Sequence, residues 1–545
     1  MVIKINRLQK YFFNGLLLSA AAIAMRTVAV GFNVYVSSRL GAEGMGLLNL
    51  TSSVYGFAIT LATSGINLAV VRLVSSALPY ENDSYFDKKA DRRVKKIMTN
   101  ALLYCLFFSL LASLILFTGS DNICVYILGD KRAALSLKIL SFTLLPISLS
   151  SALNGYFCAV RRVYKNVIVQ LLEQGVKIFV VSSLLLLIAP NGVEHACSSV
   201  IVGGAISEAF SLIISALLYF FDRRIHKKND CDFPEKADTC RGFYIKKPKN
   251  VKKESVFGVA FPVAVGAYAR SALLTIEHLA IPWGLKMSGS SSANALASYG
   301  ILHGMVFPLL LFPSSVLGAF SSLLVPELSS AKEQGDYKRI SSIVSRVFYF
   351  SLLFSVGVAG IFVCFSHEIG AFVYSSQEAG DFIRMLSPLI PLMYLDGAVD
   401  SMLKGLGEQM YTMRVNILDS LISVLLILAL LPAFGVEGYI TVIFLMELFN
   451  TSFSILRLLN VTKLKTPVFK WVIKPLLSIV FSTVISRIIF SIDSVYSFLV
   501  FYIDNKYITF FEIFVSLALY LAFAKISGSV SKKDFYFAKG LFGKA

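Results

Sequence analysis

The chain has 545 residues, of which 56% are hydrophobic and only 15% are charged, and its mean hydropathy is +0.71. Soluble globular proteins carry about 25% charged residues, so this composition excludes an ordinary soluble domain and indicates an integral membrane protein. The net charge of +18 does not by itself indicate a nucleic-acid partner, because the positions of the basic residues decide its meaning.

Hydrophobic stretches long enough to cross a bilayer as helices recur along the whole chain. A hydrocarbon core of about 30 Å needs roughly 20 apolar residues per helix, and the alternating pattern of a β-barrel is absent. We therefore predict an all-α integral membrane protein with about fourteen transmembrane helices. The predicted spans, in chain order, are 12–37, 46–71, 98–120, 135–158, 168–189, 197–221, 256–285, 295–325, 343–365, 382–403, 413–432, 437–459, 471–491 and 508–527.

The basic residues in the loops predict how the chain is oriented. With the N-terminus inside, most of the 51 Lys and Arg residues fall on the inner side of the membrane. Positive residues concentrate in cytoplasmic loops, so we expect a multi-pass protein with both termini in the cytoplasm. Anionic membrane lipids are the expected neighbours of these basic loops. The opposite side holds only Arg39, Lys131, Arg132, Lys286 and Lys506.

The chain nearly repeats itself at an offset of about 245 residues. Matches that share one offset and follow the helix order indicate a repeat, and a chance alignment of apolar segments is the alternative. The matched positions include Arg26 with Arg270, Tyr104 with Tyr349, and Pro146 with Pro391. A repeat of six helices predicts two lobes in parallel orientation, related by an axis along the membrane normal.

This repeat predicts the domain organisation. We expect an N-terminal six-helix lobe over 1–221 and a basic cytoplasmic linker over 222–255. A C-terminal six-helix lobe follows over 256–460, and residues 461–545 hold helices thirteen and fourteen with a basic cytoplasmic tail. Two lobes that face one another leave a central cavity in which a substrate can bind.

Three segments resemble a known family of carriers: residues 64–74 at the end of helix two, 313–329 in helix eight, and 403–407 after helix ten. With these segments the chain resembles the multidrug/oligosaccharidyl-lipid/polysaccharide exporter superfamily, and within it the polysaccharide transporter branch that contains stage V sporulation protein B. The resemblance implies alternation between inward-open and outward-open states in a bacterial plasma membrane. It further implies that polyprenyl-diphosphate-linked sugars move to the outer leaflet, and that helices thirteen and fourteen border a groove for the lipid tail.

Two arginines remain deep inside predicted spans. An arginine at a helix centre costs about 2.5–3.5 kcal/mol on insertion scales, so such a residue needs a reason to be there. Arg26 and Arg270 lie at repeat-related positions and offer planar groups that bind phosphate through two hydrogen bonds. We predict that they clamp the diphosphate of the substrate. The alternative is that each pairs with a buried carboxylate, as Arg270 could with Glu277 two turns along the same face.

Other polar residues in the spans suggest further roles. Asn33 lies two turns beyond Arg26 and could bind a sugar hydroxyl, or form a plain helix–helix hydrogen bond. Asp396 and Asp400 are one turn apart, and His278 follows Glu277. Two nearby carboxylates in a low dielectric do not ionise together easily, so Asp396, Asp400 and His278 are our candidates for binding a coupling ion, H⁺ or Na⁺.

Three charged positions in the spans also have structural interpretations. Asp400 could instead pair with Lys404, one turn further along the helix. Lys177 follows Glu173 by four residues, so these two can pair in the same way. Arg487 lies near the outer end of its helix, where its side chain can reach the interface.

The functions considered from the sequence fall into two classes. The favoured one is a flippase for a polyprenyl-diphosphate-linked oligosaccharide or peptidoglycan precursor, and an ion-coupled multidrug exporter of the same superfamily is the alternative carrier. A membrane glycosyltransferase or polymerase would need a larger acidic outer loop than the short ones here. We expect no catalytic residues, no metal site and no cofactor besides a coupling ion.

Overall fold

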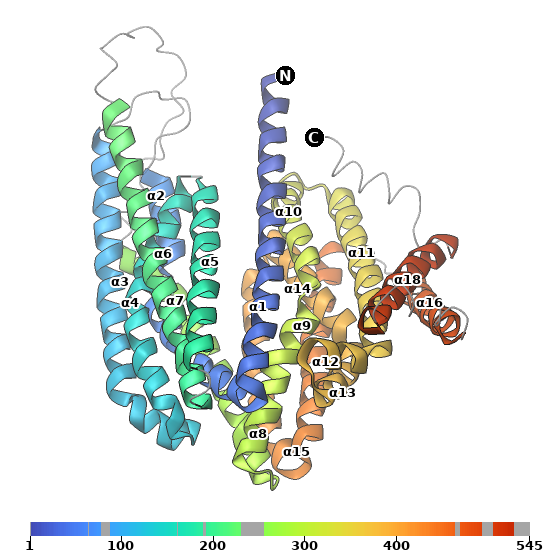
Figure 1. Ribbon diagram of the computed structural model, residues 1–545. Coiled ribbons are helices and arrows are strands. Elements are labelled where there is room, and N and C mark those ends of the chain that lie inside the picture. Colours follow the sequence, from blue (N-terminus) through green and yellow to red (C-terminus); the bar gives the residue numbers. More distant parts are fainter. Residues whose placement is uncertain are drawn as a thin grey trace. The chain divides into compact units, whose positions relative to one another are not determined.

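The computed structural model describes residues 2–63, 65–77, 88–160, 162–188, 192–229, 256–463, 469–492 and 505–527 (Figure 1). Within these ranges the backbone is helical apart from short turns, and no strand occurs. The predicted all-α class is therefore confirmed. The chain divides into two compact units. We call Leu47–Leu279 the 47–279 unit, and Ala280–Ala545 together with Met1–Gly46 the 280–545 unit.

The 47–279 unit is a bundle built around one long helix, α4. This helix packs against α2, α3 and α6, and α6 packs in turn against α5. Apolar residues at helical spacing explain these contacts, because Ile66, Val70, Ala101 and Phe157 are fully buried in a common core. Its elements are the second half of α1 (Val2–Thr63), α2 (Ile66–Ala77), α3 (Lys88–Asn122), η1 (Ile123–Leu128), η2 (Lys131–Ala133), α4 (Ala134–Ala159), α5 (Val163–Ile188), α6 (Val193–Asn229) and most of α7 (Val256–Met287).

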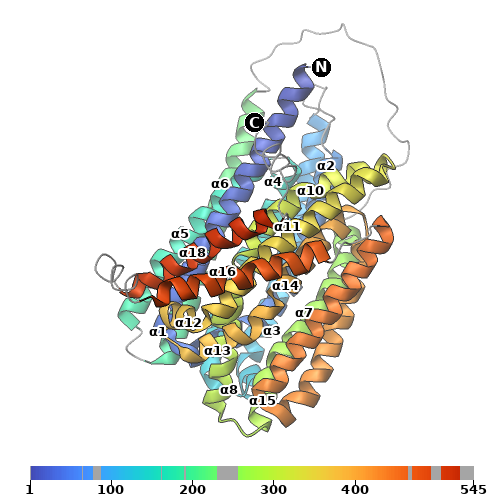
Figure 2. The ribbon, with the colours of Figure 1, turned by 90° about the vertical axis from the view of Figure 1, so that its right-hand side faces the viewer.

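The 280–545 unit is centred on α14, which packs against α10, α11 and α15. The elements are α8 (Ser292–Tyr299), η4 (Gly300–Val306), α9 (Phe307–Leu311), α10 (Ser314–Glu333), α11 (Tyr337–Cys364), α12 (Ser366–Tyr374), α13 (Gln377–Leu386), η5 (Ser387–Leu389), α14 (Ile390–Gly405), α15 (Gln409–Thr462), η6 (Phe469–Ile473), α16 (Lys474–Ser491) and α18 (Asn505–Ile526). The last two helices lie side by side, and α16 packs on α11 (Figure 2).

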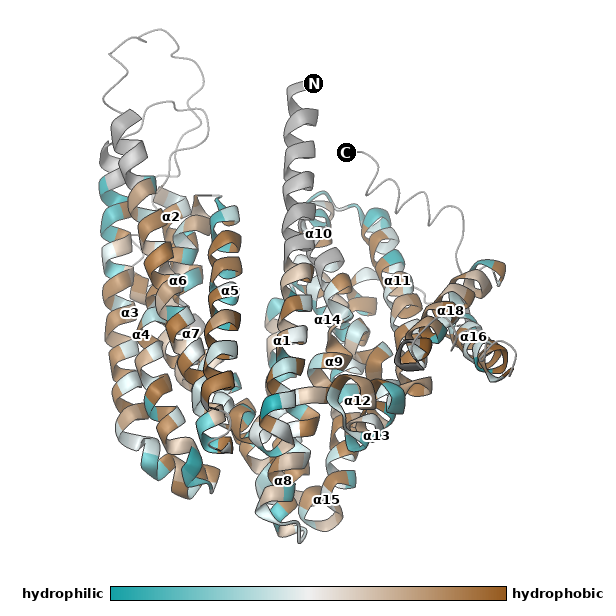
Figure 3. Ribbon diagram, in the orientation of Figure 1, coloured by the Kyte–Doolittle hydropathy of each residue, from teal (hydrophilic) through white to brown (hydrophobic). Residues whose placement is uncertain are grey.

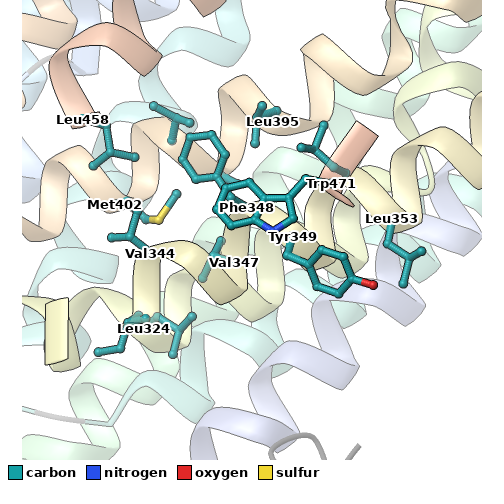
Figure 4. Close-up of a cluster of buried hydrophobic side chains, with 14 of the residues drawn as sticks. Leu324, Val344, Val347, Phe348, Tyr349, Leu353, Leu395, Met402, Leu458 and Trp471 are labelled. Carbon is teal, nitrogen blue, oxygen red and sulfur yellow. The ribbon is translucent and has the colours of Figure 1, made fainter. Parts of the chain in front are cut away.

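A hydrophobic core in the 280–545 unit joins α10, α11, α14, α15, η6, α16 and α18 (Figure 4). Val344 and Phe348 of α11 meet Leu395 and Met402 of α14 in this core. The ring of Trp471, from η6, lies 6.0 Å from that of Phe348 between centroids. These contacts attach the segment that leads into α16 to the centre of the unit, so the two additional C-terminal helices are anchored through burial of an aromatic side chain.

Eleven segments in the described part of the chain are long and apolar enough to cross a membrane. Hydrophobic residues cover most of the length of helices such as α3 and α5, including their outward faces (Figure 3). A chain with this many apolar helices is a multi-pass membrane protein. The predicted number of fourteen spans is not confirmed and stays a prediction.

Two of the eleven segments each contain two predicted spans, which explains part of the difference in number. The segments Ala22–Ala77 and Gln409–Thr462 are each longer than one crossing needs. Glycines with positive φ, Gly41 at 68° and Gly435 at 59°, bend α1 and α15 within these segments. The predicted single span 295–325 is divided into α8, η4, α9 and α10, and Pro313 lies between the last two. Proline lacks the N–H that would continue the helix, so a break is expected there.

The compact units do not follow the predicted lobe boundaries, which stay a prediction. The part of α1 up to Gly46 groups with 280–545, and most of α7 groups with 47–279. Close backbone approaches account for both groupings. A Cβ on Gly46 would lie 2.0 Å from the Leu296 carbonyl oxygen, and one on Gly65 would lie 2.2 Å from that of Ala260. Small residues let transmembrane helices approach this closely. Most of the predicted linker 222–255 and of the predicted basic tail lies outside the described residues.

Candidate functional site

Arg26 lies in the first half of α1, where its side chain is exposed. It forms no ion pair with a described residue of its own unit, so the alternative of a helix-bracing pair is not seen there. Its charge acts on the hydroxyl group of Tyr394 in α14. That hydroxyl donates a hydrogen bond to the Leu310 carbonyl oxygen at 2.5 Å. Arg26 therefore lies within electrostatic range of α14, and its exposed guanidinium group can reach a ligand.

Arg270 is exposed on α7, in the other unit. Among the described residues of that unit it has no ion-pair partner, so the predicted alternative pair with Glu277 is not formed. Glu277 and His278 are half-buried on the same helix. The backbone next to Arg270 is joined to α1, because the hydroxyl oxygen of Ser271 lies 3.0 Å from that of Thr60. Since the two arginines belong to different units, the diphosphate clamp stays a prediction.

The helix that carries the first resembling segment is broken beside Arg270. Gly65, with φ of 77°, separates α1 from α2 inside a predicted span. A break leaves carbonyl groups without their helical partners, which is costly in a bilayer. Tyr268 of α7 donates to the Leu61 carbonyl oxygen at 3.3 Å, and Ser148 of α4 donates to that of Ala62 at 3.0 Å. The helix is thus discontinuous at the start of the 64–74 segment. The carbonyl groups of Leu61 and Ala62, just before the break, accept hydrogen bonds from two neighbouring helices.

The other two resembling segments meet in one helix contact. Ser329 of α10 donates to the Gly405 carbonyl oxygen of α14 at 2.8 Å, and Lys332 donates to that of Leu406 at 2.5 Å. A Cβ at Gly405 would lie 3.1 Å from the Val325 carbonyl oxygen, so only a small residue fits there. These motifs are packing and capping features, which explains why they indicate a family without naming a substrate.

Asp396 lies in a polar cluster that connects α14 to both halves of α15. Asn450 Nδ2 lies 3.5 Å from Asp396 Oδ2 and 3.5 Å from Asn416 Oδ1. The carboxyl group of Glu447 lies within electrostatic range of Asp396 and of Asp419. We call these five residues the α14–α15 cluster. It places three carboxyl and two amide groups in an otherwise apolar region of the 280–545 unit.

Sequence reasoning identified one member of this cluster as an ion-coupling candidate and missed the two asparagines. The signal was present in the spacing of polar residues along α15. Asn416 and Asp419 are three residues apart, as are Glu447 and Asn450, so each pair shares a helix face. Among the described residues, no group of three or more His, Cys, Asp or Glu side chains is placed to hold a metal ion.

The other two ion-coupling candidates do not join the cluster. Asp400 instead pairs with Lys404, at 3.6 Å between carboxylate and ammonium, as the alternative interpretation predicted. His278 belongs to the 47–279 unit. Asp396 contacts Asn450 of α15, whereas Asp400, one turn nearer the end of α14, pairs with Lys404 of its own helix.

The 47–279 unit has a counterpart of this cluster with a different charge balance. Glu173 and Lys177 of α5 do not form the predicted ion pair, and both act on Glu208 of α6. At an offset of 246 residues, which matches Asp419 to Glu173, the position of Lys177 is taken by Ser423. The acids of the 47–279 unit, Glu173 and Glu208, therefore lie near a lysine, whereas Ser423 supplies no positive charge to the α14–α15 cluster.

Arg487 does not extend freely toward the interface as predicted. Its guanidinium group donates to the Cys364 carbonyl oxygen at 2.7 Å and to Glu368 Oε1 at 2.5 Å. Its Nε lies 3.5 Å from Glu512 Oε1, and the group stands 4.4 Å from the Phe365 ring centroid. Arg487 thus fastens α16 to α18 and to the end of α11, and no role in substrate binding is needed to explain it.

Comparison with known proteins places these features in a family. The family model described as polysaccharide biosynthesis protein matches residues 13–332. This chain belongs to the polysaccharide biosynthesis protein family. A second model, named MatE, matches residues 285–428 of this family member.

Two curated relatives and two solved structures extend the comparison. This polysaccharide biosynthesis protein is 24% identical to stage V sporulation protein B of Bacillus subtilis over 436 residues, which is 79% of this chain and 80% of that protein. It is 21% identical to the lipid II flippase MurJ of the same organism over 438 residues, 76% of each chain.

The structural matches show which fold the chain has. MurJ in an inward closed conformation superposes with a TM-score of 0.64 at 14% identity, covering 94% of this chain and 98% of that one. An inward-facing multidrug resistance transporter of the MATE family gives a TM-score of 0.59 at 12% identity, covering 82% of this chain and all of that one. The fold is therefore that of these all-helical transporters.

Proposed function

We propose that this protein is a flippase that moves a polyprenyl-diphosphate-linked oligosaccharide or peptidoglycan precursor from the inner to the outer leaflet by alternating access. The observation that carries the proposal is the pair of exposed arginines at repeat-related positions, Arg26 and Arg270, neither of which has a carboxylate partner in its own unit. An exposed arginine inside an apolar helix is costly unless it serves a ligand. The relative named as a lipid II flippase supports a lipid-linked substrate.

In this proposal the arginines bind the diphosphate and neighbouring residues bind the sugar. Arginine stays charged and donates two parallel hydrogen bonds to phosphate oxygens. Asn33 supports a sugar-binding role, because its Oδ1 atom is buried and has no hydrogen-bond partner among the described residues. Glu277 offers a carboxylate that accepts from sugar hydroxyls. We place the protein in a bacterial plasma membrane with both termini in the cytoplasm, as the basic loops predict.

The second candidate is an ion-coupled multidrug exporter, which the MatE match and the MATE-family structures favour. Cavities that bind cationic drugs favour acids and aromatic rings, and exposed arginines oppose such ligands. We propose transport in either case and not catalysis, since the named relatives are carriers or sporulation proteins.

Native mass spectrometry of the purified protein tests the flippase proposal. We expect polyprenyl-diphosphate lipid to co-purify with the wild type, and Arg26→Ala and Arg270→Ala each to retain roughly tenfold less, because each loses a charge-assisted bidentate contact. Arg384→Ala is the matched control, since Arg384 is also an exposed arginine of this chain and is predicted to lie near a membrane surface. It should retain lipid as the wild type does.

Each other outcome of that experiment has a defined meaning. Equal retention by the wild type and all three variants would remove the clamp and leave the arginines without a role in binding. Absence of lipid from every sample, together with efflux of a cationic dye from cells that express the protein, would favour the multidrug exporter.

We further propose that a coupling ion, H⁺ or Na⁺, binds at the α14–α15 cluster through Asp396. Support comes from the charge balance, because the related cluster contains Lys177 and this one has Ser423 at the matching position. Carboxyl groups that gather in an apolar region favour uptake of a proton or a cation. Asp400 forms an ion pair with Lys404, so we do not propose it as a ligand of the coupling ion.

Comparing two matched substitutions on one helix tests the coupling ion. Transport of a labelled polyprenyl-diphosphate disaccharide into proteoliposomes would be measured with an imposed pH gradient and, separately, with an imposed Na⁺ gradient. Asp396→Asn should lower the gradient-driven rate roughly tenfold, the effect of losing about 1.4 kcal/mol of ion binding. Asp400→Asn should change it less than about twofold, because a partly exposed pair contributes little. Equal effects of the two substitutions would contradict the assignment.

A further inference from the structure

A groove lies between the start of α11 and the end of α15, in the 280–545 unit, at the end of both helices that is predicted to be cytoplasmic. It has a volume of about 560 Å³ and is bordered by polar and basic side chains. The residues that line it are Tyr337, Lys338, Ser341, Ser342, Ser345, Thr462 and Lys463. None of these residues has a part in the substrate or ion sites described above.

The groove carries positive charge that no described carboxylate neutralises. Lys338 and Lys463 are exposed and form no ion pair with any described residue. Two acids near the start of α11 have other partners, because Asp336 caps α11 by accepting from the Arg339 backbone N–H at 3.0 Å, and Glu327 pairs with the Arg339 side chain at 3.1 Å. The two ammonium groups of the groove are therefore free to bind an anion.

The hydroxyl groups in the groove suit a phosphate. Ser341 and Ser345 are one turn apart on α11, so both point along the same face and can donate to separate oxygens of one ligand. Lysine ammonium groups bind phosphate as point charges, and hydroxyls add directed hydrogen bonds. Thr462 is occupied, because it donates to the Leu458 carbonyl oxygen at 2.7 Å. The combination of two lysines and three serines fits a phosphate monoester or diester.

The surface below the groove indicates that this phosphate belongs to a lipid. Leu456 lies two turns before Lys463 on the same face of α15 and is 56% exposed. An exposed apolar side chain about 10 Å deeper than a basic groove matches the arrangement of an acyl chain below a headgroup. Tyr337, 64% exposed at the rim, is an aromatic residue of the interfacial type.

We propose that this groove is a binding site for the phosphate headgroup of an anionic phospholipid of the inner leaflet, separate from the site of the transported substrate. The lysines neutralise the phosphate, the serines of α11 donate hydrogen bonds to it, and an acyl chain lies along Leu456. Occupancy of the groove joins α11 to the end of α15, so the lipid acts as a structural ligand of the 280–545 unit.

Lipid retention by native mass spectrometry tests this proposal. The protein would be equilibrated with mixed micelles that contain equal amounts of phosphatidylglycerol and phosphatidylcholine. We expect Lys338→Gln/Lys463→Gln to retain roughly fivefold less phosphatidylglycerol than the wild type. The Ser345→Leu variant should lose a similar amount of phosphatidylglycerol, because the leucine side chain fills the groove while both lysines remain. The matched control is Lys95→Gln/Lys525→Gln, which removes two exposed lysines that do not line the groove.

The outcomes separate a lipid site from its alternatives. Equal retention by the wild type and the groove variants would overturn the proposal, as would a loss in the control as large as in the double groove variant. A loss in the lysine variant that Ser345→Leu does not share would show a general effect of charge and would also overturn it. Displacement of phosphatidylglycerol by millimolar inorganic phosphate would assign the groove to a soluble anion and overturn the lipid source.

Discussion

Replacing Asp222 with alanine is expected to lower the free energy of unfolding by about 3–5 kcal/mol, the cost of removing one partner from a buried ion cluster. Asp222, at the end of α6, is 1% exposed and accepts from both Arg162 and Lys165, which precede and begin α5. Without the carboxylate, two cations remain side by side with little access to water. The thermal midpoint in detergent should fall sharply.

An exposed ion pair of the same unit provides the control. Asp121 lies 2.8 Å from Lys138, and their side chains are 66% and 36% exposed. Asp121→Ala should change the free energy of unfolding by less than about 1 kcal/mol, because water screens the pair. If the two alanine variants had equal midpoints, the Asp222 cluster would not be the stabilising bracket described here.

The 280–545 unit has a bracket at the related place with its charges reversed. Glu408, in the turn before α15, binds Arg457 near the end of the same helix, at 2.7 Å. The position of Glu408 matches that of Arg162 at an offset of 246 residues. The other two partners, Arg457 and Asp222, do not match at this offset, because they are 235 residues apart. Each unit therefore ties the turn before one helix to the end of a following helical segment, with the charge at the matched position reversed.

Gly300→Ala is expected to have the second largest effect on stability, about 3 kcal/mol, because the added methyl group has no space. A Cβ at this position would lie 2.1 Å from the Ala42 carbonyl oxygen and 2.4 Å from the Gly46 amide nitrogen. Both neighbours are backbone atoms, so the helices must separate to admit it. Ala42 and Gly46, like Gly300 and Gly304, are small residues at a spacing of four that permits close helix packing.

Gly318→Ala is the matched control, since Gly318 lies in a helix of the same unit and a Cβ there meets no atom within 4 Å. Alanine favours a helix over glycine by up to about 1 kcal/mol, so this variant should be as stable as the wild type or slightly more so. Both would be compared by thermal unfolding in the same detergent. A Gly300→Ala protein as stable as Gly318→Ala would show that the close approach of α1 to η4 is not required.

The charged residues inside the predicted spans show how much of the candidate site could be predicted from the sequence. Arg26 and Arg270 stood out because a charge is rare inside an apolar span, and the structure places both as exposed groups. Asp396 and Asp400 lie one turn apart on one helix. The pair of Asp400 with Lys404 follows from helical spacing, whereas the contact of Asp396 with Asn450 of α15 is not visible in helical spacing alone.

The amino-acid sequence by itself determined that this is an all-α membrane protein of a carrier family, because hydrophobicity summed over some twenty residues decides whether a helix enters a bilayer. Tertiary structure alone decided which polar groups meet. Asn450 reaches Asp396 across 54 residues, and Asp222 reaches Arg162 across 60. Pairings of this kind depend on which face each helix turns toward its neighbours, and many packings satisfy the same pattern of apolar residues.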